Sequence, residues 1–546
     1  MISRRLIEKA DALLQREKGT VYKDPGGRVN VCLAYPNTYH VGMSSLGFQG
    51  IYSILNSRDD TVCERVFLPD EEDMKEFERT GSELFSIESK RPLNRFDIVA
   101  FSVSFENDYP SVPLMLRLAR IGAFSSGRGR REPLLLLGGV CATFNPEPLA
   151  DFFDLVFIGE ADSAIGELIE LYKETGDREA FLEAAPGREG CYVPAFYGVA
   201  YSDDGKIMER RTHGDAPPLI KKRTEKALDG RLRPSIITPA TEFSDMYLIE
   251  AMRGCVWSCR FCVAGRIYDP PRHKEIGVLR QETARALETT GRVGLIGPSL
   301  TDYRHAEEAL QTEGVDFSIT SLRATPRAER LLSLMKGRRS VSMAPEAGTE
   351  RLRRIINKRI TEEDILETAE RVLRHDITAL RLYFMVGLPF ETEADIDGIV
   401  ALTKKIRSLS RRGTIVLSIS TFVPKPFTPL QWHPMAAEKT VKARLKTIKS
   451  GLDMKGVRVF HDVIKYAFMQ GVFSRGDRRL SRVLNEMREP GRWKECLREA
   501  GLDPGFYLFR QRDFDETLPW DFIDAGISKD ALWQEYLEAR ESAGLH

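Results

Sequence analysis

The sequence contains no run of eighteen or more apolar residues, so hydropathy predicts no helix that could span a membrane. It also lacks net charge, because 80 Lys and Arg residues balance 80 Asp and Glu residues. That balance removes any general electrostatic reason to expect binding to nucleic acid or to an anionic membrane. We find neither internal repeats nor long low-complexity segments. With 42% hydrophobic and 29% charged residues, the composition is that of a soluble globular protein.

The N-terminal residues 1–24 are basic but include Glu8, Asp11 and Glu17, and they lack the apolar core of a signal peptide. We therefore predict an amphipathic surface helix here and a cytoplasmic protein. Eight cysteines in 546 residues, without a secretion signal, indicate reduced thiols. Three of the eight, Cys255, Cys259 and Cys262, fall within eight residues and require a chemical explanation.

The first third of the chain alternates short apolar runs with helical patterns. The runs are β-branched and almost continuously hydrophobic, as in the strands of a parallel sheet that is covered on both faces. The predicted strands are Val29–Tyr35, Val62–Leu68, Ile98–Val103, Leu134–Gly138 and Leu155–Gly159. We predict a doubly wound, flavodoxin-like α/β domain over residues 25–189, with its ligand beyond the carboxyl ends of the strands.

The pattern changes after residue 190. Residues 190–245 predict a hairpin around an Asp-Asp-Gly turn, followed by a proline-punctuated linker. A second βα array over residues 246–435 fits a partial (β/α)6 barrel, with chemistry at its carboxyl face. Its predicted strands are Met246–Ala251, Val293–Ile296, Phe317–Thr320, Ser340–Ala344, Ala379–Val386 and Val416–Phe422. Residues 436–546 are rich in charged helix formers and predict a mainly helical C-terminal domain.

The cysteine cluster directly follows the first strand of the second array. Its spacing, C-x3-C-x2-C, allows three thiolates to converge on one metal site. A structural zinc site would normally need four protein ligands, and the nearest further candidate is His273. Three thiolates on a cubane iron–sulfur cluster leave one iron without a protein ligand. Zinc or a chance cluster remains the alternative interpretation.

This loop, with Phe261 before its last cysteine, resembles the signature of the radical S-adenosylmethionine (SAM) superfamily. The resemblance implies a [4Fe–4S] cluster on Cys255, Cys259 and Cys262, with SAM bound at the open iron. It also implies an oxygen-sensitive enzyme that receives one electron from a donor such as flavodoxin or ferredoxin. Cleavage of SAM would then yield a 5′-deoxyadenosyl radical that abstracts hydrogen from a substrate.

Further positions in the barrel resemble the SAM pocket of the same superfamily. Gly297 and Ser299 stand where the family cradles the SAM amino group, and Glu346 stands where a polar side chain reaches the ribose. Lys358 matches a cation for the SAM carboxylate, and Gly387 belongs to a Gly-Leu-Pro turn near the adenine. Each position also has a plain structural interpretation, as a helix cap, a solvated charge or a strand-ending turn.

The N-terminal domain resembles the cobalamin-binding domain found upstream of many radical SAM barrels. The resemblance lies in three loops, at residues 35–42, 104–111 and 138–147, and assigns cofactor contacts to Asn37, Tyr39, Gly42, Ser104, Gly138 and Gly139. Glycines at 138 and 139 would let the backbone approach a nucleotide tail. Tyr39 stands where the cobalt-ligating histidine would be, and His40 is one position off, so the resemblance does not support cobalt ligation by histidine.

Several functions remain open on these residues. One is cobalamin-assisted methylation of an unknown small molecule or peptide, and another is a rearrangement or cyclisation with a vestigial cobalamin domain. A methylthiotransferase would need three N-terminal cysteines for a second cluster, and only Cys141 lies in a suitable loop. A non-catalytic iron–sulfur scaffold protein is the alternative outside enzymes. Nucleic acid is not expected as a partner.

Overall fold

The computed structural model describes residues 2–545 except 320, 336–339, 376 and 411. The chain forms two compact units, each assembled from three stretches of sequence. The first unit contains Met1–Leu248, Gly476–Pro504 and Asp515–Gly526, and the second contains Ile249–Arg475, Gly505–Phe514 and Ile527–His546. Among the described residues, no helix is long and apolar enough to cross a membrane.

The first unit is built on a parallel sheet with the strand order β2-β1-β3-β4-β5, which is the flavodoxin-like order. A sixth strand, β6 (Cys191–Tyr192), adds to β5 in the antiparallel sense. The strands are β1 (Val29–Tyr35), β2 (Thr61–Phe67), β3 (Ile98–Ser102), β4 (Leu134–Gly138) and β5 (Leu155–Phe157). The five strands predicted from continuous hydrophobicity are confirmed because this sheet is buried across nearly its whole width.

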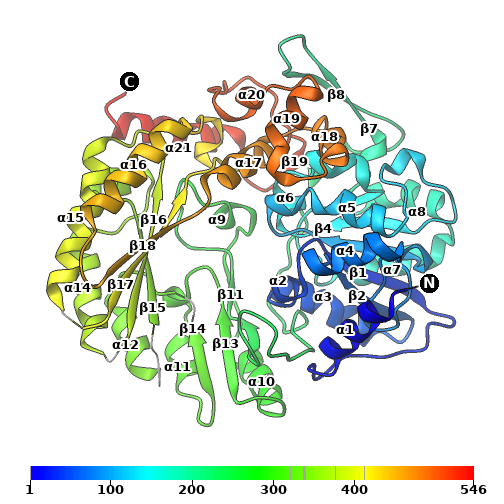
Figure 1. Ribbon diagram of the computed structural model, residues 1–546, viewed down its shortest axis with the longest axis horizontal. Helices are drawn as coiled ribbons and strands as arrows, with labels where there is room; N and C mark the ends of the chain where they lie inside the picture. Colours follow the sequence, from blue (N-terminus) through cyan, green and yellow to red (C-terminus); the bar gives the residue numbers. More distant parts are fainter. Residues whose placement is uncertain (1, 320, 336–339, 376, 411, 546) are drawn as a thin grey trace. The chain divides into compact units, whose positions relative to one another are not determined.

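Helices precede this sheet and connect its successive strands (Figure 1). They are α1 (Arg4–Leu14), α2 (Tyr39–Met43), α3 (Leu46–Ser57), α4 (Glu71–Thr80), α5 (Ser111–Leu118), α6 (Val140–Phe144), α7 (Ala164–Thr175) and α8 (Arg178–Ala184). The predicted N-terminal helix is confirmed in α1. The predicted hairpin is also confirmed, in antiparallel strands β7 (Tyr197–Tyr201) and β8 (Ile207–Thr212).

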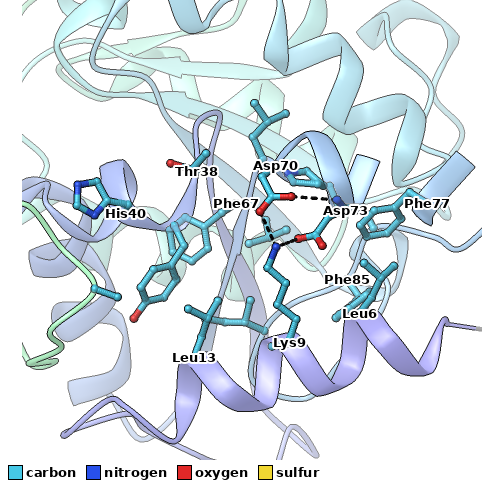
Figure 2. Close-up of a pocket in the computed structure, with 18 residues that line it drawn as sticks. Leu6, Lys9, Leu13, Thr38, His40, Phe67, Asp70, Asp73, Phe77 and Phe85 are labelled. Atoms are coloured by element: carbon cyan, nitrogen blue, oxygen red, sulfur yellow. Dashed lines mark hydrogen bonds and ion pairs between the residues drawn. The ribbon is translucent and has the colours of Figure 1, made fainter. Parts of the chain in front are cut away.

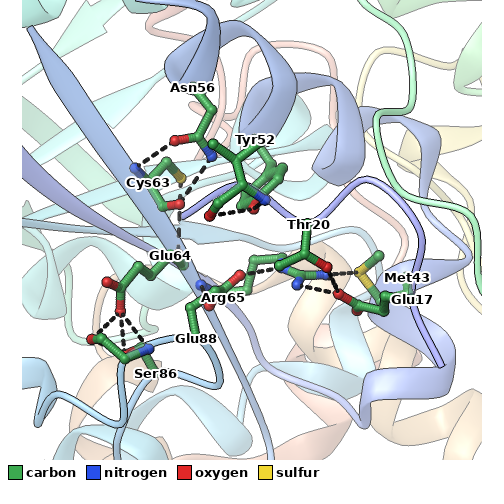
Figure 3. A network of polar contacts seen from close by, with 12 residues as sticks. Glu17, Thr20, Met43, Tyr52, Asn56, Cys63, Glu64, Arg65, Ser86 and Glu88 are labelled. Carbon is green, nitrogen blue, oxygen red and sulfur yellow. Dashed lines mark hydrogen bonds and ion pairs between the residues drawn. The ribbon is translucent and has the colours of Figure 1, made fainter. Parts of the chain in front are cut away.

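A fully buried arginine lies in the core of the first unit (Figure 3). Arg65, on β2, donates from Nε to Glu88 at 2.7 Å and from Nη2 to Glu17 at 2.7 Å, and these side chains are at most 1% exposed. Burial raises the pKa of Glu17, but the charge of Arg65 and the hydrogen bonds from Arg65, Thr20 and Tyr39 together outweigh burial and hold that pKa below its usual value. Burial dominates for Glu88, whose pKa is raised. Arg65 therefore ties the segment after α1 to the sheet.

The second unit contains a curved array of seven strands that follow one another in sequence order. Three form one sheet, β10-β13-β14, and four form another, β15-β16-β17-β18, and a parallel bridge between Leu322 and Met343 joins the two. The strands are β10 (Tyr247–Glu250), β13 (Arg292–Ile296), β14 (Asp316–Ile319), β15 (Ser340–Glu346), β16 (Ala379–Val386), β17 (Thr414–Thr421) and β18 (Val457–His461). The partial (β/α) barrel is confirmed, although Thr320, at the end of one predicted strand, lies outside the described residues.

Helices α14, α15 and α16 cover the outer side of strands β16–β18 (Figure 1). The elements that complete this unit are β11 (Met252–Arg253), α9 (Ala264–Ile267), β12 (Arg272–His273), α10 (Ile276–Leu287), α11 (Ala306–Leu310), α12 (Arg327–Leu334), α13 (Glu350–Ile355), α14 (Glu362–Arg374), α15 (Glu393–Leu409), η8 (Pro429–Trp432), α16 (Glu438–Gly451), α17 (Ile464–Arg475) and α21 (Lys529–Ser542). The chain passes from the first unit into the second within β10.

The structure differs from the predicted separate domain over residues 436–546. The segment is mainly helical, but it contains β18, which pairs in parallel with β17 as a seventh barrel strand. Its helices α18 (Leu480–Glu486) and α19 (Trp493–Glu499) belong to the first unit, whereas α21 belongs to the second. The strand was missed because β18 lies at the edge of its sheet, where Arg458 and Phe460 are exposed and the pattern is not apolar.

Replacing Arg65 with methionine should lower the free energy of unfolding of the first unit by about 3–5 kcal/mol, because two buried carboxylates lose their partner. The measurement is urea unfolding followed by circular dichroism. Arg130→Ala is a matched control, because the Arg130 pair with Glu179 is 83% and 64% exposed and should contribute less than about 1 kcal/mol. Equal losses in the two variants would contradict the role assigned to the buried arginine.

Candidate functional site

The cysteine loop leaves the barrel through a turn that only glycine can make. Gly254 has a φ of +77°, and a Cβ atom built there would lie 2.3 Å from the carbonyl oxygen of Tyr268. The preceding strand is fixed by Arg253, whose guanidinium donates to both oxygens of Glu250 at 2.8 and 2.7 Å. The sequence therefore forces an abrupt turn at the carboxyl end of the first barrel strand and presents the cysteines there.

The three cysteines are free thiols at different depths. Cys259 is buried, whereas Cys255 and Cys262 are partly exposed. Burial raises the pKa of Cys255 and raises that of Cys259 to about 11, although the positive charges of Lys358 and Arg323 oppose the shift at Cys259. The charge of Cys262 acts on both other thiols, so the three lie near one another. The three thiols are partly desolvated and lie near the cations Lys358 and Arg323. In their thiolate form they are suited to bind a positively charged metal centre.

An arginine that the sequence analysis missed lies beside the thiols. The Arg323 guanidinium stacks 3.6 Å from the centre of the Trp257 ring, and its Nη2 donates to the carbonyl oxygen of Lys358 at 2.5 Å. Burial lowers its pKa, while the charges of Cys259 and Cys255 oppose that shift. The sequence could have identified Arg323 by its position just after the predicted third barrel strand, because the loops at the carboxyl ends of barrel strands supply catalytic and binding residues.

The predicted residue Ser299 is brought to this loop through an aspartate. Ser299 Oγ and Trp257 Nε1 both donate to Asp302 Oδ2, each at 2.6 Å. Asp302 therefore fixes the indole of Trp257, which in turn supports the stacked guanidinium of Arg323.

Two other predicted residues lie in the same part of the barrel. Gly297 packs tightly, because a Cβ atom there would lie 2.6 Å from Cγ of Met252. Phe261, in the cysteine loop, is half-buried.

Glu346 and Lys358 form an ion pair at the carboxyl end of β15. Lys358 Nζ lies 3.0 Å from Glu346 Oε1, with side chains 11% and 15% exposed. Glu346 has a φ of +68°, and Asn357, next to Lys358, has a φ of +54°. Asn357 Nδ2 donates to the carbonyl oxygen of Ser258 at 2.8 Å, which ties this segment to the cysteine loop. Strained backbone at non-glycine residues is typical of a functional site.

The predicted Gly-Leu-Pro turn ends β16 and is held by a glutamate. Gly387 has a φ of +81°, and its N–H donates to Glu391 Oε2 at 2.7 Å. Arg444 Nη1 lies 2.6 Å from the same oxygen. Burial raises the pKa of Glu391 to about 7, against the opposing hydrogen bond from Gly387 and charge of Arg444. Because this buried pair holds the turn, Gly387 keeps one backbone arrangement at the barrel mouth.

Helix α21 braces the cysteine loop from the C-terminal part of the chain. Arg266, just after the loop, donates to both oxygens of Glu535 at 2.8 and 2.6 Å. Arg260, inside the loop, donates to Glu538 at 2.7 Å and to the carbonyl oxygen of Ile355 at 2.9 Å. Sequence reasoning did not identify this brace, because the partners lie more than 250 positions apart and only the fold brings them together.

The residues present fit a cubane cluster better than a closed zinc site. Among the residues that the structure describes, no three Cys, His, Asp or Glu side chains already form a group that could hold a metal ion. The thiols nevertheless lie within mutual electrostatic range, and Cys255 and Cys262 are partly exposed. Three thiols, with no fourth ligand grouped with them in the described part of the chain, match a centre that keeps one open coordination position.

In the first unit, the carboxyl ends of β1 and β3 form the switch point of a 2-1-3-4-5 sheet, the place where ligands of such folds bind. Asn37, after β1, donates to Asp108, after β3, at 2.8 Å. Ser104 contacts Tyr35 by a side-chain hydrogen bond. Burial raises the pKa of Asp108 to about 7, although the hydrogen bond from Asn37 opposes the shift.

The glycines predicted to face cobalamin have two different roles. Gly139 has a φ of +99°, and its Cβ would lie 2.4 Å from the carbonyl oxygen of Val103, so it serves strand packing. Gly138 is open, because the nearest atom to a Cβ there is 4.0 Å away. Gly42 packs against the Phe67 ring, which a Cβ would approach to 2.6 Å. A ligand backbone or tail can therefore approach closely at Gly138.

No cobalt ligand is offered at the position that a histidine would take. Tyr39 is buried, donates its hydroxyl to Glu17 at 2.5 Å and packs its ring on Phe67 with a centroid distance of 5.1 Å. Burial raises the pKa of Tyr39, which keeps the hydroxyl protonated. His40 is 55% exposed and faces Glu242 at 3.6 Å. The side chains of Tyr39 and His40 therefore fit a corrinoid whose cobalt has no protein ligand, and they do not fit ligation of cobalt by histidine.

Comparison with known families identifies two regions of the chain. Residues 47–194 match the family described as "Radical SAM proteins, N-terminal". Residues 249–403 match the family described as "Radical SAM superfamily", and this match begins in β10 and contains all three loop cysteines. The chain is also similar to the uncharacterized protein MJ0966 of Methanocaldococcus jannaschii, with 27% identity over 481 residues, which cover 87% of this chain and 94% of that protein.

Among solved structures, the chain is similar to the cobalamin-dependent SAM radical enzyme OxsB. The structure of OxsB with aqua-cobalamin and SAM bound gives a TM-score of 0.43 at 13% identity, and the structure with aqua-cobalamin alone gives 0.43 at 15% identity. Each match covers 69% of this chain and 52% of OxsB. The chain therefore spans about half the length of OxsB.

Replacing Asp108 with asparagine should remove a pH dependence of stability. Because the folded pKa is about 7 and the ordinary value is 3.8, folded Asp108 binds a proton more tightly than unfolded Asp108 between these values. Wild-type stability should therefore fall as pH rises through this window, and the variant should be more stable at pH 8 by on the order of a few kcal/mol. Urea unfolding at pH 4 and pH 8 measures this, with exposed Asp203→Asn as control. A constant difference at both pH values would contradict the assignment.

Proposed function

We propose that this chain, which contains a radical SAM domain behind the N-terminal domain of radical SAM proteins, is an enzyme that cleaves SAM reductively at a [4Fe–4S] cluster. Cys255, Cys259 and Cys262 would hold the cluster. The observation that carries the proposal is the position of these thiols at the carboxyl end of the first barrel strand, beside Lys358 and Arg323. A cluster held there would supply the one-electron chemistry for reductive cleavage of SAM.

The chain's own residues would bind and orient the reactants. Arg323 and Lys358 supply positive charge beside the thiolates, which favours their ionised form. Glu346 and Lys358 now pair with each other, and on binding SAM we expect Lys358 to contact the carboxylate and Glu346 the ribose hydroxyls. Glu346 ends β15 and Lys358 follows α13, and their side chains already meet, so each could turn to SAM from its present place.

The finer proposal is cobalamin-assisted methylation of an unknown small molecule or peptide. It is supported by the 2-1-3-4-5 sheet and by the open backbone at Gly138, which suit a ligand at the switch point. A vestigial domain combined with a radical rearrangement or cyclisation is the second candidate, because Asn37 and Tyr39 are both engaged in internal hydrogen bonds. In either case a flavodoxin or ferredoxin is the proposed electron donor.

Two alternatives have less support. A methylthiotransferase would need a second cluster near the N-terminal domain, but Cys32, Cys63 and Cys141 are all buried, with burial raising the pKa of Cys32 and Cys63 far above the usual thiol value. A non-catalytic iron–sulfur scaffold would not require an ion pair and two cations directed at the cluster.

Anaerobically reconstituted protein should cleave SAM to 5′-deoxyadenosine in the presence of dithionite, and alanine at Cys255, Cys259 or Cys262 should abolish both cleavage and iron binding. Product is measured by liquid chromatography, and iron by colorimetric assay. Cys496→Ala, a partly exposed thiol outside the loop, is the matched control and should behave as wild type. Wild-type protein that holds iron and sulfide but releases no 5′-deoxyadenosine would refute the proposal and leave the scaffold function.

Protein purified anaerobically with added cobalamin should show the visible absorption of a bound corrinoid. Gly138→Leu should lose that absorption and remain folded, because a side chain at this position meets no atom closer than 4.0 Å and would occupy the space through which a corrinoid would approach. Gly127→Leu is the control, since it also has free space and lies in an exposed loop. SAM cleavage without corrinoid binding would favour rearrangement or cyclisation over methyl transfer.

A further inference from the structure

A cavity of about 300 Å³ lies in the first unit under helix α1 (Figure 2). Its floor is the carboxyl end of β2, at Val66, Phe67 and Leu68. One wall is α1, and the remaining walls come from α4, the loop after it and the start of α2. Since β2 is the edge strand of the sheet, this cavity lies on the opposite side of β1 from the switch point between β1 and β3. It shares Tyr39 with the residues that the cobalamin resemblance predicts, but its floor lies at β2 and not at the switch point.

Apolar side chains line most of the cavity. The apolar residues are Leu6, Ala10, Leu13, Val66, Phe67, Leu68, Pro69, Phe77, Leu84, Phe85, Ile87 and Ala240. Cavities of this volume with apolar walls and a few polar groups are typical binding sites for small molecules. Roughly ten heavy atoms would fill it at about 30 Å³ each, a volume that matches a chain of eight carbons with a polar head.

The polar end of the cavity carries excess negative charge. Lys9 Nζ lies between Asp70 Oδ2 at 2.5 Å and Asp73 Oδ2 at 2.6 Å, so one cation faces two carboxylates (Figure 2). The exposed fraction of the side chains falls from 48% at Asp70 to 13% at Asp73, so the charge extends inward from solvent. The second oxygen, Asp73 Oδ1, is buried and accepts no hydrogen bond from the described residues. An unpaired carboxylate oxygen favours a ligand with a donor at this end, and the Asp73 carboxylate must turn to meet that donor because this oxygen has almost no accessible surface.

Helix α1 has the properties of a movable cover. Only Leu6 and Ala10 are buried in it. Its polar contacts are partly exposed: Arg5 pairs with Glu72 at 3.1 Å, Lys9 with Asp70 and Asp73, and Lys90 with Asp11, while Ser3 before the helix donates to Glu76. Exposed pairs of this kind stabilise a contact by little. The chain after the helix is anchored, because Lys18 exchanges two backbone hydrogen bonds with Ile237, each at 2.9 Å. Glu17 is also fixed, by Arg65 and Tyr39, so the helix can open only on Gln15 and Arg16.

We propose that this cavity binds a small amphiphile with an apolar body of about eight carbons and a protonated amine, which would donate to Asp73. A carboxylate head would meet two aspartates and only one lysine, so the charges at this end disfavour it. The binding site does not depend on the radical chemistry of the barrel.

The test uses the full-length protein and three probes of equal chain length: octylamine, octanol and octanoate. Calorimetry should show that octylamine binds at least about tenfold more tightly than octanol, because one charge-assisted hydrogen bond is added, and that octanoate binds most weakly. Asp73→Asn should remove the preference for the amine while leaving octanol binding unchanged. Bound octylamine should also slow hydrogen exchange in α1.

Two tryptophan variants on α1 form a matched pair. Ala10→Trp fills the cavity and should abolish binding of all probes, whereas Ala12→Trp lies on the exposed face and should bind octylamine as wild type does. Absence of octylamine binding to wild-type protein would overturn the proposal. Equal binding of octylamine by both tryptophan variants would show that the ligand binds outside this cavity. Tighter binding of octanoate than of octylamine would overturn the assignment of an amine.

Discussion

The cost of placing thiolates in a partly desolvated loop is the constraint around which the barrel site is arranged. Burial raises the pKa of Cys259, and even with Lys358 and Arg323 opposing the shift the pKa is about 11. A loop without these two cations would hold its thiols still more firmly in the neutral form, which binds metal poorly. Both cations are themselves held in place by neighbouring side chains. Glu346 fixes the lysine, and Trp257 supports the guanidinium of Arg323. The electrostatics of the thiols therefore depend on residues from four different barrel loops.

Holding these loops together requires backbone strain and distant braces. Glu346, Asn357 and Arg359 all have positive φ, which costs on the order of 1 kcal/mol or more at each non-glycine position. The strain is offset where Asn357 donates to the cysteine loop and where α21 clamps Arg266 and Arg260. Because α21 lies more than 250 positions from the cysteine loop, the geometry of the loop depends on a segment that is distant in sequence.

Local patterns predicted most of the strands and the cysteine cluster but not the contacts that connect them. Continuous apolar runs identified β1 and β4 at their observed bounds, since both are buried on two faces. The edge strand β18 was not predicted, because its exposed positions carry Arg458 and Phe460 and its sequence is not a continuous apolar run. Spacing and resemblance proposed Ser299 and Lys358, whereas Arg323, Asp302 and Glu535 became visible only when the fold brought distant segments together. No sequence pattern encodes those long-range pairs.

The buried Arg65 network explains why the first unit can carry a loosely held N-terminal helix. Glu17 follows α1 and is anchored by two short contacts in the core, to Arg65 and to Tyr39. The backbone pairing of Lys18 with Ile237 reinforces the same point. With the chain fixed there, α1 itself needs little stabilisation, and its apolar face can cover a cavity instead of filling a core. Tyr39 belongs to this anchor and also lines the cavity, so the residue standing at the histidine position of a cobalamin domain has a structural role in this protein.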